Sequence, residues 1–126
     1  LLFGITHKTI YMTTFKRGDV VLIAFPFTDL TTTKMRPALI LSSDTFNQTH
    51  LDVVLVAITS QVSKKVPRYD HLLSQEDQNS AGLPKPSLVK LGKIVTIDQR
   101  LIRKKLGHIP NPTLGYLTTE LHKILS

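Results

Sequence analysis

Arg36 stands directly before Pro37, and this is the first place in the sequence where chemistry is expected. The proline biases the preceding residue toward an extended backbone, which suits the start of the apolar run Ala38–Leu41. An arginine held there presents a planar fork of N–H donors that matches a phosphate group. Because guanidinium is a poor acid, Arg36 would stabilise developing negative charge rather than release a proton. The competing interpretation is a solvated or ion-paired structural arginine.

Thr59 follows the most apolar segment of the chain, Asp52–Ile58, where the backbone is expected to leave the core for a loop. A hydroxyl at such a position can be presented to a substrate from a rigid support. Ser60 and Gln61 come next and could add polar contacts. The competing interpretation is that these side chains bind nearby backbone groups and hold the turn, as Thr and Ser at strand ends often do.

The composition favours one basic globular domain. The chain has 126 residues, of which 41% are hydrophobic, and a formal net charge of +7. That hydrophobic fraction can build one core, and the charge favours a polyanionic partner such as nucleic acid. Excess positive charge can also serve solubility alone, so the charge by itself does not decide the function.

Several classes of site are excluded or disfavoured by residue type. The chain has no cysteine, which excludes disulfides and thiolate metal sites, and its five histidines lack the spacing of a zinc site. We therefore predict no metal or other cofactor. No apolar run approaches the roughly 20 residues that span a bilayer, so we expect no membrane contact and a cytoplasmic location. Residues 1–11 precede Met12 and are expected to be a non-native or disordered extension, which leaves 12–126 as a single domain.

The elements that must position these residues are mostly short strands. Apolar and β-branched runs predict strands at Val20–Phe25, Ala38–Leu41 and Asp52–Ile58. Further strands are predicted at Leu88–Leu91, Ile94–Ile97 and Gly107–Ile109, with Tyr69–Leu73 as a shorter candidate. Between them we expect an exposed loop over Thr28–Met35, a polar turn over Ser43–Gln48, and a long polar segment from Val62 to Gly82.

The end of the chain predicts the one long helix. Asn111 is a candidate N-cap and Pro112 suits the first helical position. An apolar stripe follows, made of Leu114, Leu117, Leu121 and Ile124. Asp98 is expected to cap a single helical turn. Many short strands with a terminal helix predict a mainly β fold, a small barrel with a docked C-terminal helix and one or two short helical turns.

Four motifs in order resemble the MazF/PemK family of toxins from type II toxin-antitoxin systems. They are Gly18-Asp19-Val20-Val21, Arg36-Pro37-Ala38-Leu39-Ile40-Leu41-Ser42, Thr59-Ser60-Gln61, and Ser87-Leu88-Val89 leading to Thr96-Ile97-Asp98. The resemblance extends from Arg17 to Ser126. It implies an SH3-like barrel of the CcdB/MazF/Kid type, a homodimer, and metal-independent cleavage of single-stranded mRNA to 2′,3′-cyclic phosphate and 5′-hydroxyl ends. It also implies an antitoxin protein as partner, whose complex with the toxin binds its own promoter DNA.

The resemblance also assigns roles to residues. It pairs Arg36 with Thr59 as catalytic residues, with Thr59 orienting or polarising the scissile phosphate. The RNA-binding candidates are Ser60 and Gln61, and the lysines Lys34, Lys64, Lys65, Lys90 and Lys93, all of which the family pattern places beside one groove. Phe25, Phe27 and Tyr69 are candidates for base stacking. The basic residues between Arg100 and Lys105 lie away from that groove in the family and are expected to be solvated.

The sequence departs from the family where a proton carrier is expected. Relatives commonly have an acid where this chain has Gly92, and some have an acid or histidine at the positions of Leu30 and Thr31. Asp29 is the nearest loop carboxylate and a possible general base. This departure leaves open a non-catalytic RNA-binding or regulatory homologue. A gyrase-poisoning toxin on the same fold is a further alternative, disfavoured because Leu121–Ser126 is expected to be a buried helix end.

Overall fold

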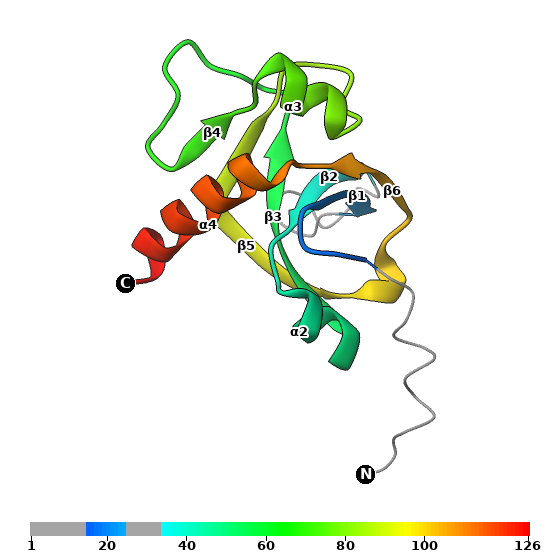
Figure 1. Cartoon of the computed structure of the whole chain (residues 1–126). Helices are drawn as coiled ribbons and strands as arrows, with labels where there is room; N and C mark the ends of the chain where they lie inside the picture. Colours follow the sequence, from blue (N-terminus) through cyan, green and yellow to red (C-terminus); the bar gives the residue numbers. More distant parts are fainter. Residues whose placement is uncertain (1–14, 25–33) are drawn as a thin grey trace.

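The structure is a computed structural model that describes residues 15–24 and 34–126. Six strands form one antiparallel sheet in the order β4-β5-β3-β2-β1-β6 (Figure 1). The strands are β1 (Asp19–Ala24), β2 (Met35–Ile40), β3 (Asp52–Thr59), β4 (Asp70–Leu72), β5 (Leu88–Asp98) and β6 (Lys104–His108). The helices are α2 (Asp44–Thr49), α3 (Gln75–Ser80) and α4 (Asn111–Leu125), with a 3-10 turn at Gln99–Leu101. The predicted fold class is confirmed.

The sheet rolls up without closing. Figure 1 shows β5, β3, β2, β1 and β6 curling around a common interior, while β4 and β6 remain the two edges of the hydrogen-bonded ladder. Two backbone hydrogen bonds connect the segment between β5 and β6 to the rest of the sheet. They run from Gln99 N–H to Leu51 O (2.8 Å) and from Arg103 N–H to Leu22 O (2.9 Å). The rolled sheet therefore has an inner face and an outer face, which the alternation of side chains along each strand separates.

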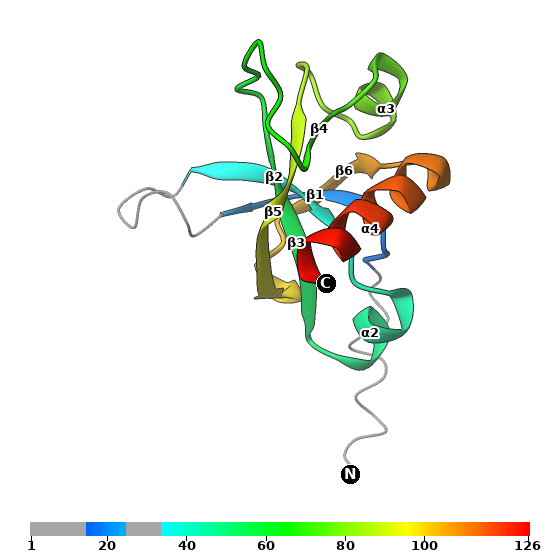
Figure 2. The same ribbon diagram turned by 90° about the vertical axis from the view of Figure 1, so that its left-hand side faces the viewer.

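Each face carries its own core. The inner face gathers the fully buried side chains of Val21, Ile23, Ala38, Ile40, Val53 and Leu55. The outer face packs against α4, where the sheet side chains of Val20, Leu39, Val56, Ile58 and Val89 form one buried cluster with Leu114 and Leu117 of the helix. Figure 2 shows α2, α3 and α4 on the same side of the strands. The inner face therefore carries no helix, and any site on it is supported by strands alone.

The last helix follows its predicted stripe. Leu114 and Leu117 are buried, and Leu121 and Ile124 are partly buried. The predicted cap is wrong, because the N-cap is Pro110 and it makes no side-chain capping bond, while Asn111 is the first helical residue. The expected burial of the chain end holds only in part, since Leu125 is 68% exposed.

Helix α2 corrects one prediction of irregular structure. The polar turn expected over Ser43–Gln48 is part of this helix, capped by the Ser43 hydroxyl, which accepts from Phe46 N–H (3.1 Å). Asn47 is buried there and its side-chain N–H donates to Ser42 O (3.2 Å). Serine, asparagine and aspartate favour caps as much as turns, so a short capped helix and a polar turn have similar sequence patterns.

The long polar segment from Val62 to Gly82 also holds more order than expected. It contains the short strand β4, as predicted, and the unpredicted helix α3, which Ser74 caps by accepting from Asp77 N–H (3.1 Å). Only Gln78 of this helix is buried. With so little apolar burial, α3 carries no amphipathic period that the sequence could have shown.

The two strands predicted on either side of Gly92 form the single strand β5. Lys90 is opposite Ala57 and Ile94 is opposite Val56, so the register shifts where residues 91–93 of β5 are accommodated. Gly92 is exposed and an added Cβ would meet nothing within 4 Å. The glycine that suggested a turn thus lies in a β-bulge, the other common place for glycine within strands.

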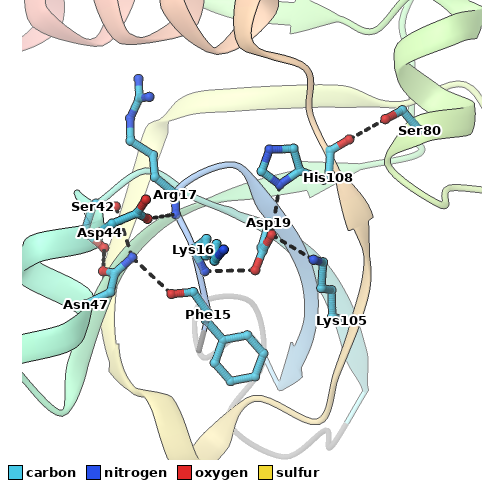
Figure 3. Close-up of polar contacts among 10 residues, drawn as sticks. All are labelled: Phe15, Lys16, Arg17, Asp19, Ser42, Asp44, Asn47, Ser80, Lys105 and His108. Atoms are coloured by element: carbon cyan, nitrogen blue, oxygen red, sulfur yellow. Dashed lines mark hydrogen bonds and ion pairs between the residues drawn. The ribbon is translucent and has the colours of Figure 1, made fainter. Parts of the chain in front are cut away.

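A buried carboxylate joins the two strands at the β6 edge. Asp19 is 1% exposed and accepts from Lys16 N–H (2.8 Å), while His108 Nδ1 (2.9 Å) and Lys105 Nζ (3.2 Å) contact its Oδ1 (Figure 3). A buried carboxylate needs such partners, because an uncompensated one would be costly. This cluster holds β1, β6 and the segment before β1 in register.

Three predictions lie outside the described residues: the extension at 1–11, the loop carboxylate Asp29 and the aromatic pair Phe25 and Phe27. No helix within residues 15–24 and 34–126 is long and apolar enough to cross a membrane.

Candidate active site

Arg36 and Thr59 lie on neighbouring strands at the same end of the sheet. The β2–β3 register pairs Ala38 with Ala57, and Ile40 with Leu55. Continuing that register by two residues puts Arg36 opposite Thr59, the last residue of β3. Residues opposite each other in antiparallel strands project to the same face, with Cβ atoms about 5 Å apart. Two residues 23 positions apart in sequence are therefore neighbours at the end of this strand pair.

Both side chains belong to the inner face. Arg36 pairs with Ile23 across β1–β2, and Ile23 is a member of the inner core. Both Arg36 and Thr59 are partly buried, so each has a supported side chain that still reaches solvent. An arginine and a threonine in this arrangement can hold one phosphate between a cationic fork and a hydroxyl donor.

The Thr59 hydroxyl has a local partner as well. Its Oγ1 accepts from Gln61 N–H at 3.1 Å. This bond is the turn-holding contact expected of a Thr at a strand end, and it uses the oxygen only as an acceptor. The hydroxyl proton can still be donated to a phosphate oxygen. Ser60 and Gln61 themselves are exposed beside it.

Lys90 also lies on the inner face, one row further along β5. It is opposite Ala57 on β3 and Asp70 on β4, and its ammonium contacts Asp70 Oδ2 at 2.8 Å. The side chain of Asp70 is 10% exposed and that of Lys90 is 28% exposed. Lys90 is thus an ion-paired lysine beside the catalytic candidates rather than a freely solvated one.

Asp70 is a site residue that the sequence analysis missed. The segment around it was expected to form a short strand, but the strand has only three residues and its alternation cannot tell which face the side chains take. Pairing with β5 decides the face. Asp70 and Lys90 are 20 residues apart in sequence, and nothing local links them.

The other predicted RNA-binding lysines are exposed and less tightly placed. Lys34 directly precedes β2, two residues before Arg36, and Lys93 lies in the bulge next to Gly92. Lys64 and Lys65 belong to the segment between β3 and β4, where Ser63 donates to Lys65 O at 2.7 Å. Lys34, Lys64 and Lys65 lie beyond the ends of strands that carry Arg36 or Thr59, whereas Lys93 lies in the middle of β5.

The Tyr69 ring, a candidate for base stacking, does not lie on the inner face. Its ring is covered by the Arg68 guanidinium, whose carbon is 4.7 Å from the ring centre, and Tyr69 has a left-handed backbone with φ of 70°. Its hydroxyl raises the pKa of Arg68, to which Glu120 and Tyr116 of α4 also contribute. Arg68 and Tyr69 therefore lie on the α4 side of the sheet.

The basic residues after β5 are surface residues, as expected. Arg100 donates to both carboxylate oxygens of Asp98, and this contact lowers the pKa of Asp98 to about 2. Arg103 and Lys104 are exposed, and Lys105 contacts Asp19. In the described part of the chain, no group of three or more His, Cys, Asp or Glu side chains could hold a metal ion.

The family model for the PemK-like, MazF-like toxin of type II toxin-antitoxin systems matches residues 16–125. This chain belongs to that family. Among curated proteins, the toxin is 29% identical over 96 residues to the endoribonuclease MazF of Staphylococcus saprophyticus subsp. saprophyticus, a match that covers 75% of this chain and 77% of the relative.

Solved structures agree on the fold. The toxin superposes on a mycobacterial endoribonuclease in complex with its cognate antitoxin with a TM-score of 0.70 at 23% identity, covering 89% of this chain and 95% of the other. It superposes on MazF in a MazE–MazF structure from Deinococcus radiodurans with a TM-score of 0.69 at 21% identity, covering 88% and 94%. The resemblance stated from the four motifs is confirmed.

Proposed function

We propose that this toxin is an endoribonuclease that cleaves single-stranded RNA by transesterification, leaving 2′,3′-cyclic phosphate and 5′-hydroxyl ends. The observation that supports the proposal is that Arg36 on β2 and Thr59 on β3 share the inner face at the same end of two paired strands, in a chain whose family includes the endoribonuclease MazF. RNA carries its own nucleophile, so the reaction needs no metal and no cofactor.

In the reaction, the 2′-oxygen forms a bond to phosphorus while the bond to the 5′-oxygen breaks. The 2′-hydroxyl loses a proton and the departing 5′-oxygen gains one. Arg36 stabilises the extra negative charge on the phosphoryl oxygens in the transition state, and the Thr59 hydroxyl donates a hydrogen bond to one of them. Neither residue needs to change its protonation state for this role.

The lysines around the pair provide affinity. Lys34, Lys64, Lys65 and Lys93 contact phosphates on either side of the scissile bond, while Ser60 and Gln61 add polar contacts to the strand. Neutralisation of phosphates gives binding that weakens with salt and carries no sequence information. Asp29 is the loop carboxylate proposed as a general base.

The partners follow from the family. We expect a homodimer, a cognate antitoxin that blocks the RNA-binding face, and a toxin–antitoxin complex that binds its own promoter DNA. In support of an antitoxin partner, a structurally similar mycobacterial endoribonuclease forms a complex with its cognate antitoxin, and a similar structure from Deinococcus radiodurans contains MazE and MazF. An mRNA substrate places the action in the cytoplasm.

The test is cleavage of a single-stranded RNA in the presence of EDTA, with the products analysed by mass spectrometry. We expect fragments that end in a cyclic phosphate, and an Arg36→Ala variant that folds but does not cut. RNA binding by the parent without a cyclic-phosphate product would indicate the non-catalytic homologue instead. Inhibition of DNA supercoiling with intact RNA would indicate the gyrase-poisoning alternative.

A further inference from the structure

Lys90 and Asp70 lie on the inner face, in the row of side chains next to that of Arg36 and Thr59. The row that contains Lys90 and Asp70 continues through Ala57 on β3 and Ala38 on β2. Ala57 is partly exposed although β3 lies between β5 and β2 in the sheet, whereas Ala38 is fully buried. On β3 the Lys90 row is therefore only two residues away from Thr59.

The ion pair between Lys90 and Asp70 fixes the position of a cation on the inner face. A lysine has a flexible four-carbon stem, and an unrestrained one would extend into solvent. Asp70 takes one N–H donor of the ammonium at 2.8 Å and leaves the other two available. Because the Asp70 side chain is 10% exposed and lies on the short strand β4, it is itself held in place.

Other carboxylates in the described part of the chain do not have this placement. Asp19 is occupied at the β6 edge, and Asp52 and Asp98 face each other at the far end of β3 and β5. The remaining ones, Asp44, Glu76, Asp77 and Glu120, belong to helices on the opposite side.

We propose that Asp70 is a positioning residue for RNA cleavage, which holds the Lys90 ammonium beside the row of Arg36 and Thr59 so that it binds the phosphate contacted by these two residues, or the phosphate next to it. This inference rests on the proposed function and deepens it. Lys90 acts as a fixed phosphate ligand, and Asp70 acts through Lys90 without touching the substrate.

The experiment uses Lys90→Met, Asp70→Asn and the double variant, with Lys123→Met as matched control. Lys123 forms an ion pair of the same 2.8 Å length with Glu120, but on α4. Binding is measured with a 2′-O-methyl RNA oligonucleotide, which cannot be cleaved, across a range of salt concentrations. Cleavage is measured as kcat and KM on the unmodified oligonucleotide.

We expect Lys90→Met to reduce the slope of log affinity against log salt by about 0.7, the value for one phosphate contact on a single strand. Asp70→Asn should lower kcat/KM about tenfold or more. In the Lys90→Met background it should have no further effect, because the ammonium it positions is gone. Lys90→Arg should restore the salt slope, and Lys123→Met should leave slope and cleavage unchanged.

An unchanged salt slope in Lys90→Met would overturn the proposal, as would losses from the two single variants that multiply in the double variant. A purely structural pair would lower the melting temperature and leave the salt slope as in the parent. If the parent binds the modified oligonucleotide but cuts no RNA, the proposed nuclease function has failed, and the binding arm still decides whether Lys90 is a phosphate ligand. If the parent cuts and Arg36→Ala does not, while both variants match the parent, only the present inference fails.

Discussion

At the scale of single residues, the candidate site combines groups that keep their protonation state with groups that are positioned by partners. In the proposed reaction, Arg36 and Thr59 stabilise charge and donate hydrogen bonds, and Lys90 forms an ion pair with Asp70. None of these roles is a proton transfer. Proton transfer is the step for which this sequence departs from its family pattern, because Gly92 stands where relatives commonly have an acid.

The role of the planar guanidinium group of Arg36 can be tested without removing its positive charge. Arg36→Lys keeps a cation but replaces five planar donors with a point charge that cannot contact two phosphate oxygens in one plane. We expect kcat to fall about 100-fold with a smaller change in KM, because the lost contact strengthens in the transition state. Single-turnover cleavage under excess enzyme measures this. A lysine variant as fast as the parent would mean that Arg36 supplies only general electrostatic attraction.

Gly92 and Gly107 give a matched pair of backbone tests. A Cβ at Gly92 would meet nothing within 4 Å, so Gly92→Ala should stabilise the fold by about 0.4–1 kcal/mol through the unfolded chain. A Cβ at Gly107 would lie 2.3 Å from Ser80 O, so Gly107→Ala should destabilise it by about 2 kcal/mol or more. Urea unfolding of the two variants would show opposite shifts of the midpoint. Equal shifts would contradict the described packing of β6 against α3.

At the scale of elements, β4 and α4 meet through His71. Its ring packs on Tyr116 with centroids 5.4 Å apart, and burial lowers its pKa below the ordinary 6.5 while Asp77 opposes the shift. Protonation of His71 therefore costs more in the folded chain than in the unfolded one. The contact that His71 adds between β4 and α4, besides the pairing of β4 with β5, is therefore favoured by a neutral ring.

This arrangement predicts a pH dependence of stability. As pH falls below about 6.5 the unfolded chain binds the proton first, so the free energy of unfolding decreases until the pH has passed the lower folded-state pKa. The contribution of the neutral ring is fully present above about pH 6.5. Urea unfolding near pH 7.5 and near pH 5.5 should show a smaller loss in His71→Gln than in the parent. An equal or larger loss in the variant would contradict a lowered pKa at His71.

At the scale of the whole molecule, the open sheet has an edge strand at each end. β4 and β6 end the hydrogen-bonded ladder, and several large apolar side chains are exposed, among them Leu72, Leu101 and Leu125. Exposed strand edges and apolar side chains favour association, and the commonest closed assembly is a twofold dimer.

We therefore expect sedimentation equilibrium of the purified toxin at micromolar concentration to give the mass of two chains. Dilution should shift the mass toward one chain if the interface is modest in area. A monomer mass that persists at the highest soluble concentration would rule the homodimer out. RNA cleavage measured over the same dilution series would show whether activity follows the dimer.

The sequence alone determined the elements whose signals are local. Apolar and β-branched runs located β1, β2 and β3, and the apolar stripe located α4. Asp98 was identified as the cap of the 3-10 turn, where it accepts from Arg100 N–H. Arg36 and Thr59 were found because motifs at strand ends are themselves local patterns. The short capped helices α2 and α3 were not predicted, because they bury too little apolar surface to produce a helical hydrophobic period in the sequence.

Only the tertiary structure decided which side chains meet. The continuity of β5 through Gly92, the face on which Asp70 lies, and the contacts of Asp19 with His108 all depend on pairing between strands distant in sequence. A shift of one residue in register would turn Asp70 to the opposite face of the sheet. Strand propensity does not encode that register, because it follows from packing both cores at once. The physical reason is that a strand or helix depends on neighbouring residues in the sequence, whereas the candidate site depends on how distant strands pair.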